Sequence, residues 1–228
     1  MPPAGKPLLV SIHVPKTGGM SFQRTLEAHF GDRFRRDDAD RPANTGPLRR
    51  RLRALRAALA LARDGLAGVD CVHGHFLAAK WLLLARRRPV TFVTWLRDPV
   101  ERLASHYHYW RRSYDPATAL PLHRRAVEED WTFERFALGP ELRDLATELL
   151  WRLPRERLAF VGLTETYEAD HAAFCRRILG IARPPTTENV NPEAAPDPYV
   201  ADPALRRRIA EHHRQDVELY AWAKSTGR

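Results

Sequence analysis

The chain has 228 residues, of which 44% are hydrophobic and 29% are charged, and this balance excludes an intrinsically disordered protein. Its 37 lysines and arginines outnumber its 28 aspartates and glutamates, so we expect an anionic partner such as a nucleotide, an acidic glycan or a nucleic acid. Two cysteines are too few for a disulfide framework, and no uncharged apolar run has the length of a signal-peptide core or a membrane span. We therefore predict a single domain over residues 1–228, located in the cytoplasm and not inserted in a membrane.

The chain is predicted to begin with a strand, a loop and a helix. Residues 7–14 are apolar and β-branched, as in a buried strand, and a helix over residues 20–30 follows the loop. The second segment has helical spacing because Phe22, Leu26 and Phe30 fall on one side.

A loop and a basic helix come next. Residues 31–47 have the Asp, Arg, Asn and Pro content of a loop, and residues 48–64 have the spacing of an amphipathic helix. The apolar stripe of this helix consists of Leu52, Leu55, Leu59 and Ala62. Five arginines crowd the start of the helix: Arg49, Arg50, Arg51, Arg53 and Arg56. Between an anion-binding role and a solvated polar face, we favour the solvated face and assign these arginines no catalytic role.

Two further strands are predicted over residues 69–73 and 90–96, with a helix over 77–87 between them. The later strand reads VTFVTWL and is nearly all apolar, which is typical of strands buried inside parallel sheets. The helix that follows has a strong start signal, because Asp98 suits the cap and Pro99 suits the first helical position.

The second half of the chain continues the alternation. Helices are predicted over 120–129, 133–137, 141–153, 167–179 and 203–223. A buried strand is predicted over 158–163, whereas residues 184–198 are proline-rich and irregular. Strands that alternate with helices predict the fold class, an α/β protein with a P-loop-like parallel sheet of about four to five strands and helices on both faces.

The loop between the first strand and the first helix reads HVPKTGGMSF. Loops at the carboxyl ends of strands bind ligands in open α/β sheets, and glycine-containing backbone at a helix start can cradle an anion. Lys16 precedes Gly18 and Gly19, whereas the P-loop of nucleotide hydrolases places its lysine after the glycines. The chain also lacks G-x-G-x-x-G, the pattern of dinucleotide dehydrogenases. An anion site of another kind is therefore predicted.

Two motifs carry a resemblance to a known family. The sequence PKTGGMSF resembles the 5'-phosphosulfate loop of sulfotransferases that use 3'-phosphoadenosine-5'-phosphosulfate (PAPS), in the form found in glycan and heparan-sulfate O-sulfotransferases. The sequence WLRDPVERLASHY resembles the 3'-phosphate motif of that family, and its arginine and serine are Arg97 and Ser105 here. A guanidinium can hold a phosphate through two hydrogen bonds, and a serine hydroxyl adds another. Weaker likenesses lie at residues 160–165 and 189–191.

The resemblance implies an activity and roles for the site residues. It implies in-line transfer of a sulfuryl group from PAPS to a hydroxyl of a carbohydrate-type acceptor, without a metal. Lys16 is the candidate that binds the donor and stabilises the charge on the leaving oxygen. The other predicted donors around the 5'-phosphate are Thr17, Gly18, Gly19, Met20 and Ser21. Arg97 and Ser105 are predicted to hold the 3'-phosphate, and the alternative for Arg97 is an ion pair with Asp98 or Glu101.

The acceptor hydroxyl must lose a proton, and histidine is the usual base near neutral pH. The segment VHGHF directly follows a predicted strand, so its histidines emerge at the sheet edge that carries the phosphate loop. It also resembles the His-Gly-His segment of uronyl 2-O-sulfotransferases, and on that likeness His75 is the first candidate and His73 the second. The alternative is that both histidines pack or orient the substrate. Weaker candidates are His13, His106, His108 and Glu165.

Other classes of function stay open at this point. An ATP-dependent phosphotransferase could use the same scaffold, although the order of lysine and glycines counts against it. A basic nucleic-acid-binding protein is the less favoured alternative, because no aromatic residues alternate with the basic ones. We therefore predict no nucleic-acid partner, and the oligomeric state is not predicted. The aromatic residues available to stack on a sugar are Trp81, Tyr109, Trp110, Tyr114 and Trp131, although most aromatics of this density are core residues.

Overall fold

The computed structural model describes residues 7–40, 42–182, 200 and 202–226. The proline-rich segment 184–198 and the weak motif likeness at 189–191 lie outside these residues. Among the described helices, none has both the length and the apolar character needed to cross a bilayer.

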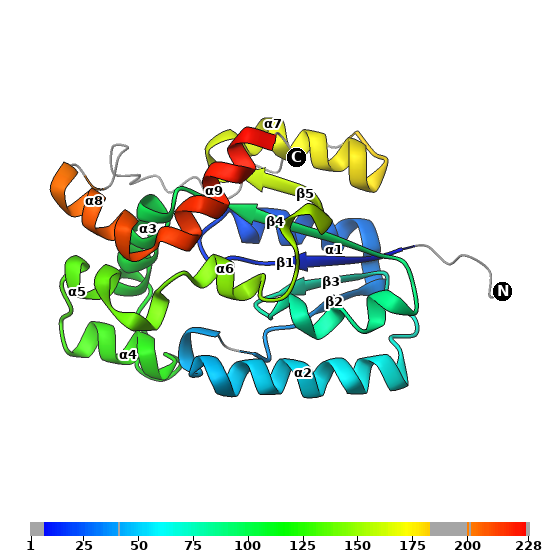
Figure 1. Ribbon diagram of the computed structural model, residues 1–228, viewed down its shortest axis with the longest axis horizontal. Helices are drawn as coiled ribbons and strands as arrows, with labels where there is room; N and C mark the ends of the chain where they lie inside the picture. Colours follow the sequence, from blue (N-terminus) through cyan, green and yellow to red (C-terminus); the bar gives the residue numbers. More distant parts are fainter. Residues whose placement is uncertain (1–6, 41, 183–199, 201, 227–228) are drawn as a thin grey trace.

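The described residues form one five-stranded sheet in the order β2-β3-β1-β4-β5, and all neighbouring strands are parallel (Figure 1). The strands are β1 (Leu8–Ile12), β2 (Phe34–Arg36), β3 (Cys71–Gly74), β4 (Val90–Leu96) and β5 (Leu158–Leu163). This sheet confirms the predicted α/β class. The three-residue β2 was missed in the sequence, because it is short and two of its residues are exposed arginines.

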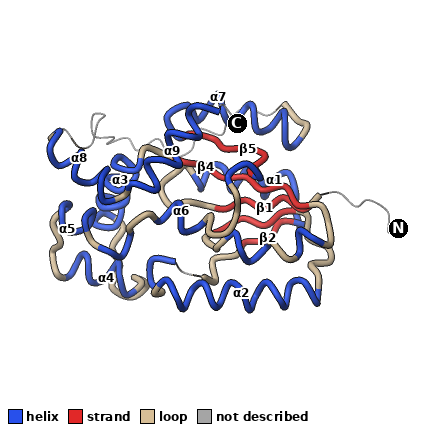
Figure 2. Tube along the Cα trace, viewed as in Figure 1, coloured by secondary structure: helices blue, strands red, loops and turns tan. Residues whose placement is uncertain are grey.

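Both faces of the sheet are covered, as predicted. Alternate residues of β1 separate into two clusters of buried side chains, since Leu8 and Val10 join one cluster and Leu9 joins the other. Phe22 from α1 and Phe174 from α7 pack with Leu9 on one face. The larger cluster on the opposite face includes residues of α3, α4, α5, α6, α8 and α9. In Figure 2, α3, α4, α5 and α8 lie together on the left, past the ends of the strands.

The α-helices of the described chain mostly match the predicted ranges. They are α1 (Gly19–Phe30), α2 (Pro47–Asp64), α3 (Pro99–Arg112), α4 (Pro121–Glu128), α5 (Phe133–Leu138), α6 (Leu145–Leu149), α7 (Tyr167–Phe174), α8 (Pro203–His212) and α9 (Arg214–Thr226). The predicted cap of α3 is confirmed, because the Asp98 carboxylate accepts hydrogen bonds from the N–H groups of Val100 and Glu101.

Four predicted helices are shorter or differently built. The helix expected over 167–179 is α-helical only to Phe174 and continues as a π-helix over Cys175–Leu179. The helix expected over 77–87 is wrong, since that segment forms the 3-10 turns η3 (Ala78–Trp81) and η4 (Leu84–Arg86). The helix expected over 141–153 shrinks to α6, which Asp144 precedes in a left-handed conformation at φ 47°. The helix expected over 203–223 divides into α8 and α9 at His213, whose φ of −105° and ψ of 37° leave the helical region.

The helix α2 turns a different side to the core from the one predicted. Its buried residues are Arg50, Ala54 and Ala58, whereas Leu52 is 47% exposed and Leu59 is 65% exposed. The narrow buried side packs on η3 and η4, where small alanines allow close approach. The prediction failed because a leucine stripe normally marks the core-facing side.

The parallel strands bring three loops to one edge of the sheet. Because β1 lies between β3 and β4, the segments that leave their carboxyl ends are neighbours. The N–H of His13 donates to the carbonyl of Gly74 at 2.9 Å, which joins the loops after β1 and β3. The hydroxyl of Thr94 donates to the carbonyl of Ile12 at 2.8 Å, which ties β4 to the end of β1. The predicted site residues are on these loops and on the helices that follow them.

Candidate functional site

The loop after β1 leads into a helix start with open backbone donors. Lys16 and Gly18 are both in left-handed conformations, at φ 70° and φ 78°, and Gly18 caps α1. No described side chain caps this N-terminus, and the first backbone bond within the helix runs from the N–H of Phe22 to the carbonyl of Gly18. The N–H groups of Gly19 and Met20 therefore have no partner from the preceding turn. Such a start suits an anion through both its donors and the helix dipole.

Both glycines of this loop are enclosed by aromatic rings. A Cβ atom on Gly19 would lie 1.9 Å from the His13 ring, and one on Gly18 would lie 2.9 Å from the Tyr167 ring. The positive φ of Gly18 also disfavours any other residue. Glycine is thus required at both positions by space, and at Gly18 by conformation as well.

The side chains of Thr17, Met20 and Ser21 have different positions. The Thr17 side chain is fully buried, and its hydroxyl donates to the carbonyl of Val14 at 2.8 Å. This hydroxyl braces the loop, so only the backbone N–H of Thr17 is a candidate donor to a ligand. Met20 is 58% exposed and Ser21 is half-buried, so both lie at the surface of the helix start.

Positive charges gather around the loop. Burial, and after it the charges of Arg112 and Arg97, lowers the pKa of Lys16 from 10.5 to about 8. The Lys16 ammonium lies 3.7 Å from the centre of the Tyr109 ring, a cation–π contact. Tyr109 and Arg112 of α3 both lie near Lys16, and the spacing of four and seven residues places Ser105 on the same side of the helix. The structure thus brings Lys16 together with Arg97 and with the side of α3 that carries Ser105.

Arg102 adds a buried cation that the sequence did not single out. Its side chain is 1% exposed, lies 3.7 Å from the Asp216 carboxylate and makes no hydrogen bond to the described residues. Burial lowers its pKa, and the charge of Arg97 acts in the same direction. Its place in the motif, five residues after Arg97, is the signal that could have identified it.

The acidic residues at the start of α3 have partners of their own. The Arg206 guanidinium pairs with Asp98 at 3.1 Å and also with Glu101. The Glu165 carboxylate accepts a hydrogen bond from the N–H of Asp98 at 2.7 Å, which ties the segment after β5 to the start of α3. Glu165 therefore has a structural contact here, and Asp98 acts as a helix cap.

The two histidines after β3 lie in different environments. The Nδ1 atom of His75 is 2.9 Å from the carbonyl oxygen of His13, and a carbonyl only accepts hydrogen bonds. The neutral His75 ring therefore carries its proton on Nδ1, which leaves the Nε2 lone pair available. His73 is 2% exposed, its Nδ1 atom contacts the Ser11 hydroxyl at 2.9 Å, and its Nε2 atom is buried without a partner. Of the pair, the geometry favours His75 as a base.

Three histidine rings stack beside the loop after β1. The His13 ring lies 5.0 Å from that of His73 and 4.6 Å from that of His75, centre to centre. Burial, followed by the charges of the neighbouring histidines, lowers the pKa of His13 well below its ordinary value. Burial also lowers the pKa of His73 to about 3 and that of His75 below its usual value. All three rings are therefore neutral near pH 7.

Asp38 is a site residue that the sequence did not reveal. Its carboxylate accepts a hydrogen bond from the N–H of His75 at 3.0 Å. Burial opposes the ionisation of Asp38, but the bond from His75 and the charge of Arg36 hold its pKa below the usual value. Two neighbouring acidic residues bind the segment that follows β3. Asp37 pairs with Lys80 at 2.6 Å, and the Asp40 carboxylate accepts a hydrogen bond from the N–H of Leu77 at 3.0 Å. The cluster DDAD in a basic chain was the available signal.

The remaining candidate residues lie at the margins of the site. His106 is 5% exposed and packs on Trp110 and Phe136, whereas His108 faces solvent, so at most one of the two is directed inward, as predicted. Trp81 and Trp131 are buried, which removes them as platforms for a sugar. Tyr109 is 38% exposed beside Lys16, so its ring remains a candidate surface for stacking against a sugar.

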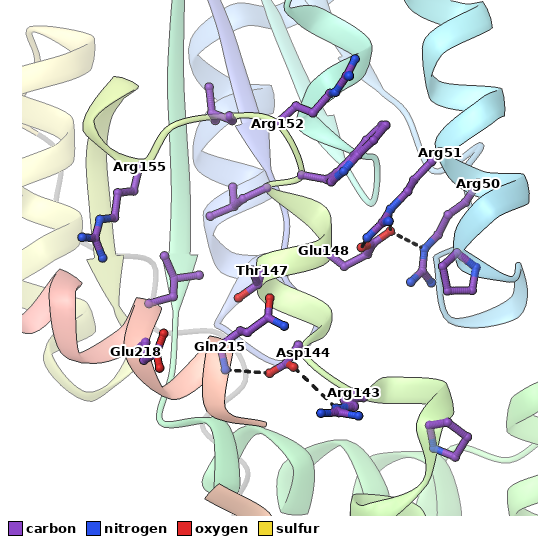
Figure 3. A pocket seen from close by; sticks show the side chains of 16 residues that line it. Arg50, Arg51, Arg143, Asp144, Thr147, Glu148, Arg152, Arg155, Gln215 and Glu218 are labelled. Carbon is purple, nitrogen blue, oxygen red and sulfur yellow. Dashed lines mark hydrogen bonds and ion pairs between the residues drawn. The ribbon is translucent and has the colours of Figure 1, made fainter. Parts of the chain in front are cut away.

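A cavity of about 610 Å³ lies elsewhere, between α2, α6 and α9 (Figure 3). In it, the Glu148 carboxylate accepts hydrogen bonds from Arg50 at 2.9 Å and from Arg51 at 2.5 and 3.0 Å. The predicted solvated face is therefore wrong for Arg50, which is 6% exposed and ion-paired. None of the residues that line this cavity belongs to the predicted site.

Within the described ranges, no three His, Cys, Asp or Glu side chains are arranged to hold a metal ion.

Comparison with known proteins gives a likeness among solved structures. No protein-family model and no curated protein matches the chain. The chain is similar to the crystal structure of a sulfotransferase from Alicyclobacillus acidocaldarius, with 18% sequence identity, a TM-score of 0.46, and coverage of 95% of this chain and 96% of that one.

Proposed function

We propose that this protein is a PAPS-dependent O-sulfotransferase that transfers a sulfuryl group to a hydroxyl of a carbohydrate-type acceptor. The observation that carries the proposal is the position of Lys16, which precedes the start of α1, contacts the Tyr109 ring of α3, and has Arg97 and Arg112 near enough to lower its pKa. Close cations repel one another, so a site of this kind is stabilised by a ligand with several negative charges. PAPS carries such charges at both its 5' and 3' ends.

In this proposal the loop after β1 binds one end of PAPS, and Arg97 together with α3 binds the other end. The N–H groups of Gly19, Met20 and Ser21 bind the 5'-phosphosulfate, with the α1 dipole behind them. Arg97 and Ser105 bind the 3'-phosphate, which a guanidinium can grip through two hydrogen bonds. Ligand charge raises the pKa of Lys16 from about 8, so Lys16 is fully cationic in the complex.

Transfer then follows an in-line displacement. The acceptor oxygen forms a bond to sulfur while the bond from sulfur to the bridging phosphate oxygen breaks, and the electron pair leaves on the 5'-phosphate. Lys16 stabilises that developing charge more than it stabilises the ground state. The products are a sulfate ester and 3'-phosphoadenosine-5'-phosphate.

His75 takes the proton of the acceptor hydroxyl in this mechanism. Its Nε2 lone pair is available because Nδ1 holds its proton against the His13 carbonyl. The Asp38 carboxylate accepts from the backbone N–H of His75, not from the ring, and its negative charge stabilises the imidazolium that forms. Tyr109, exposed beside Lys16, offers a ring face on which a sugar acceptor can stack.

Calorimetric titration tests the proposal. 3'-Phosphoadenosine-5'-phosphate, Mg-ATP and NAD are titrated into the wild type, Arg97→Ala and the control Arg207→Ala, an exposed residue of α8. We expect selective binding of 3'-phosphoadenosine-5'-phosphate, weakened by about 1.5–3 kcal/mol in Arg97→Ala, the scale of hydrogen bonds to charged groups, and unchanged in the control. A preference for Mg-ATP would reject the proposal in favour of a phosphotransferase.

A further inference from the structure

The helix α2 exposes an apolar stripe that nothing in the described chain covers. Leu48 is 74% exposed, Leu52 is 47% exposed and Leu59 is 65% exposed. These are three of the six large hydrophobic side chains that are exposed in the described residues. Their spacing of four and seven residues places them on one side of the helix, with the half-buried Leu55 between them. The helix lies along one border of the molecule (Figure 1), and we call its row of exposed leucines the apolar ridge.

Arginines border this ridge on its solvent side. Arg49, Arg53 and Arg56 are exposed, and residues 47–63 contain no aspartate or glutamate. Helical geometry of about 100° per residue places the Arg49 and Arg56 positions next to the leucine stripe and away from the core. The surface therefore combines leucines with adjacent positive charge and lacks negative charge over about four turns.

We propose that α2 docks in the plane of an anionic lipid bilayer, with Leu48, Leu52 and Leu59 inserted at the level of the headgroups. Long arginine side chains at the border of an apolar ridge can reach lipid phosphates while the leucines enter the acyl boundary. The contact is peripheral, since α2 lies flat on the surface. This proposal goes beyond the sulfotransferase activity and does not depend on it.

Charge and shape favour a membrane over other occupants. A second copy of the chain would bring two arginine rows together, which costs free energy through like-charge repulsion. Protein interfaces are usually anchored by aromatic side chains in pockets, whereas this ridge presents only leucines on a convex helix. An anionic bilayer accepts both the leucines and the arginines at once.

Co-sedimentation of the full chain with vesicles tests the proposal. The wild type should bind phosphatidylcholine vesicles that contain phosphatidylglycerol and should not bind vesicles of phosphatidylcholine alone. The triple variant Leu48→Gln/Leu52→Gln/Leu59→Gln should lose at least about tenfold in binding, because the apolar insertion is gone. Leu120→Gln, an exposed leucine of another segment, is the matched control and should bind as the wild type does.

A pair of charge variants separates a local effect from net charge. Arg49→Gln/Arg56→Gln should weaken binding about twenty-five-fold, because each arginine beside an anionic surface contributes about fivefold. Arg176→Gln/Arg207→Gln changes the net charge equally, at exposed positions outside α2, and should have little effect. Equal losses in the two charge variants, or no binding by the wild type, would overturn the proposal. So would light scattering that shows a dimer which the triple leucine variant dissociates, because α2 would then bind a second copy.

Discussion

The Nδ1 atom of His75 lies 2.9 Å from the carbonyl oxygen of His13, which fixes the tautomer of the candidate base. We predict that His75→Ala lowers transfer of radiolabelled sulfate from PAPS to an oligosaccharide panel by about 10²–10⁴-fold, the usual range for general base catalysis. Binding of 3'-phosphoadenosine-5'-phosphate should persist, because no contact to the phosphates is removed. His108→Ala, an exposed residue of α3, is the control. Full transfer activity in His75→Ala would exclude His75 as the base.

The lowered pKa of Lys16 predicts that the protein takes up protons when the sulfuryl donor binds. Its pKa of about 8 in the free protein rises when the anionic ligand arrives, so binding at about pH 8.5 takes up protons. Calorimetry in two buffers of different ionisation enthalpy measures this uptake. Lys16→Met should reduce the uptake and should also weaken binding. An uptake that is identical in Lys16→Met would assign the proton to another group.

The same pKa predicts how Lys16 affects the stability of the free protein. The unfolded chain, where the pKa is 10.5, binds this proton more tightly than the folded chain, where it is about 8. The contribution of Lys16 to the free energy of unfolding therefore increases as pH rises from 8 to 10.5. Urea unfolding of the wild type and Lys16→Met across this window measures the difference. A difference between the two proteins that does not change with pH contradicts the lowered pKa.

The close contact between Gly19 and His13 predicts that one added methyl group at Gly19 lowers the free energy of unfolding. A Cβ atom at Gly19 would lie 1.9 Å from the His13 ring, so Gly19→Ala should destabilise the protein by about 1–3 kcal/mol through overpacking. The displaced ring should also disturb His75, which it stacks against. Gly46→Ala is the matched control, because no atom lies within 4 Å of its Cβ position and its φ is −56°. Equal unfolding midpoints for the two variants would contradict the close contact.

Glu148 holds Arg50 and Arg51 at the start of α2 and is itself buried. Glu148→Gln leaves the Arg50 charge buried without its counter-charge and should destabilise the protein by about 3–5 kcal/mol in urea unfolding. Glu218→Gln breaks an exposed pair with Arg214 and should cost about 0–1 kcal/mol. A small effect at Glu148 would mean that water reaches Arg50.

Sequence patterns predicted the long apolar strands better than the short polar one. The strands β4 and β5 match their predicted ranges because both are continuous apolar runs, although β5 lies at an edge of the sheet. The edge strand β2 was missed, since Arg35 and Arg36 face solvent and its pairing to β3 comes from distant residues. The side of α2 that faces the core was misjudged, because tertiary packing buried alanines and an ion-paired arginine instead of the leucines.

The candidate site was predictable where one short segment forms it and not where distant segments meet. The phosphate loop and the Arg97 motif are local, so their residue order could be read directly. Asp38 and His13 reach His75 only because β2 and β1 flank β3, a relationship that no local pattern contains. Asp38 and the His13 carbonyl accept hydrogen bonds from the backbone N–H and the Nδ1 of His75, and these contacts became apparent only in the folded chain.

The most direct test of the proposed donor site is a thermodynamic cycle between Arg97 and the 3'-phosphate. Calorimetry compares 3'-phosphoadenosine-5'-phosphate with adenosine 5'-phosphate, which lacks only the 3'-phosphate, in the wild type and in Arg97→Ala. If Arg97 binds the 3'-phosphate, the wild type should bind adenosine 5'-phosphate more weakly than 3'-phosphoadenosine-5'-phosphate, whereas Arg97→Ala should bind the two ligands with similar affinity. The coupling free energy between Arg97 and the 3'-phosphate should then be about 1.5–3 kcal/mol. Additive losses from the substitution and from the missing phosphate would show that Arg97 does not bind the 3'-phosphate, and would contradict the proposed PAPS site.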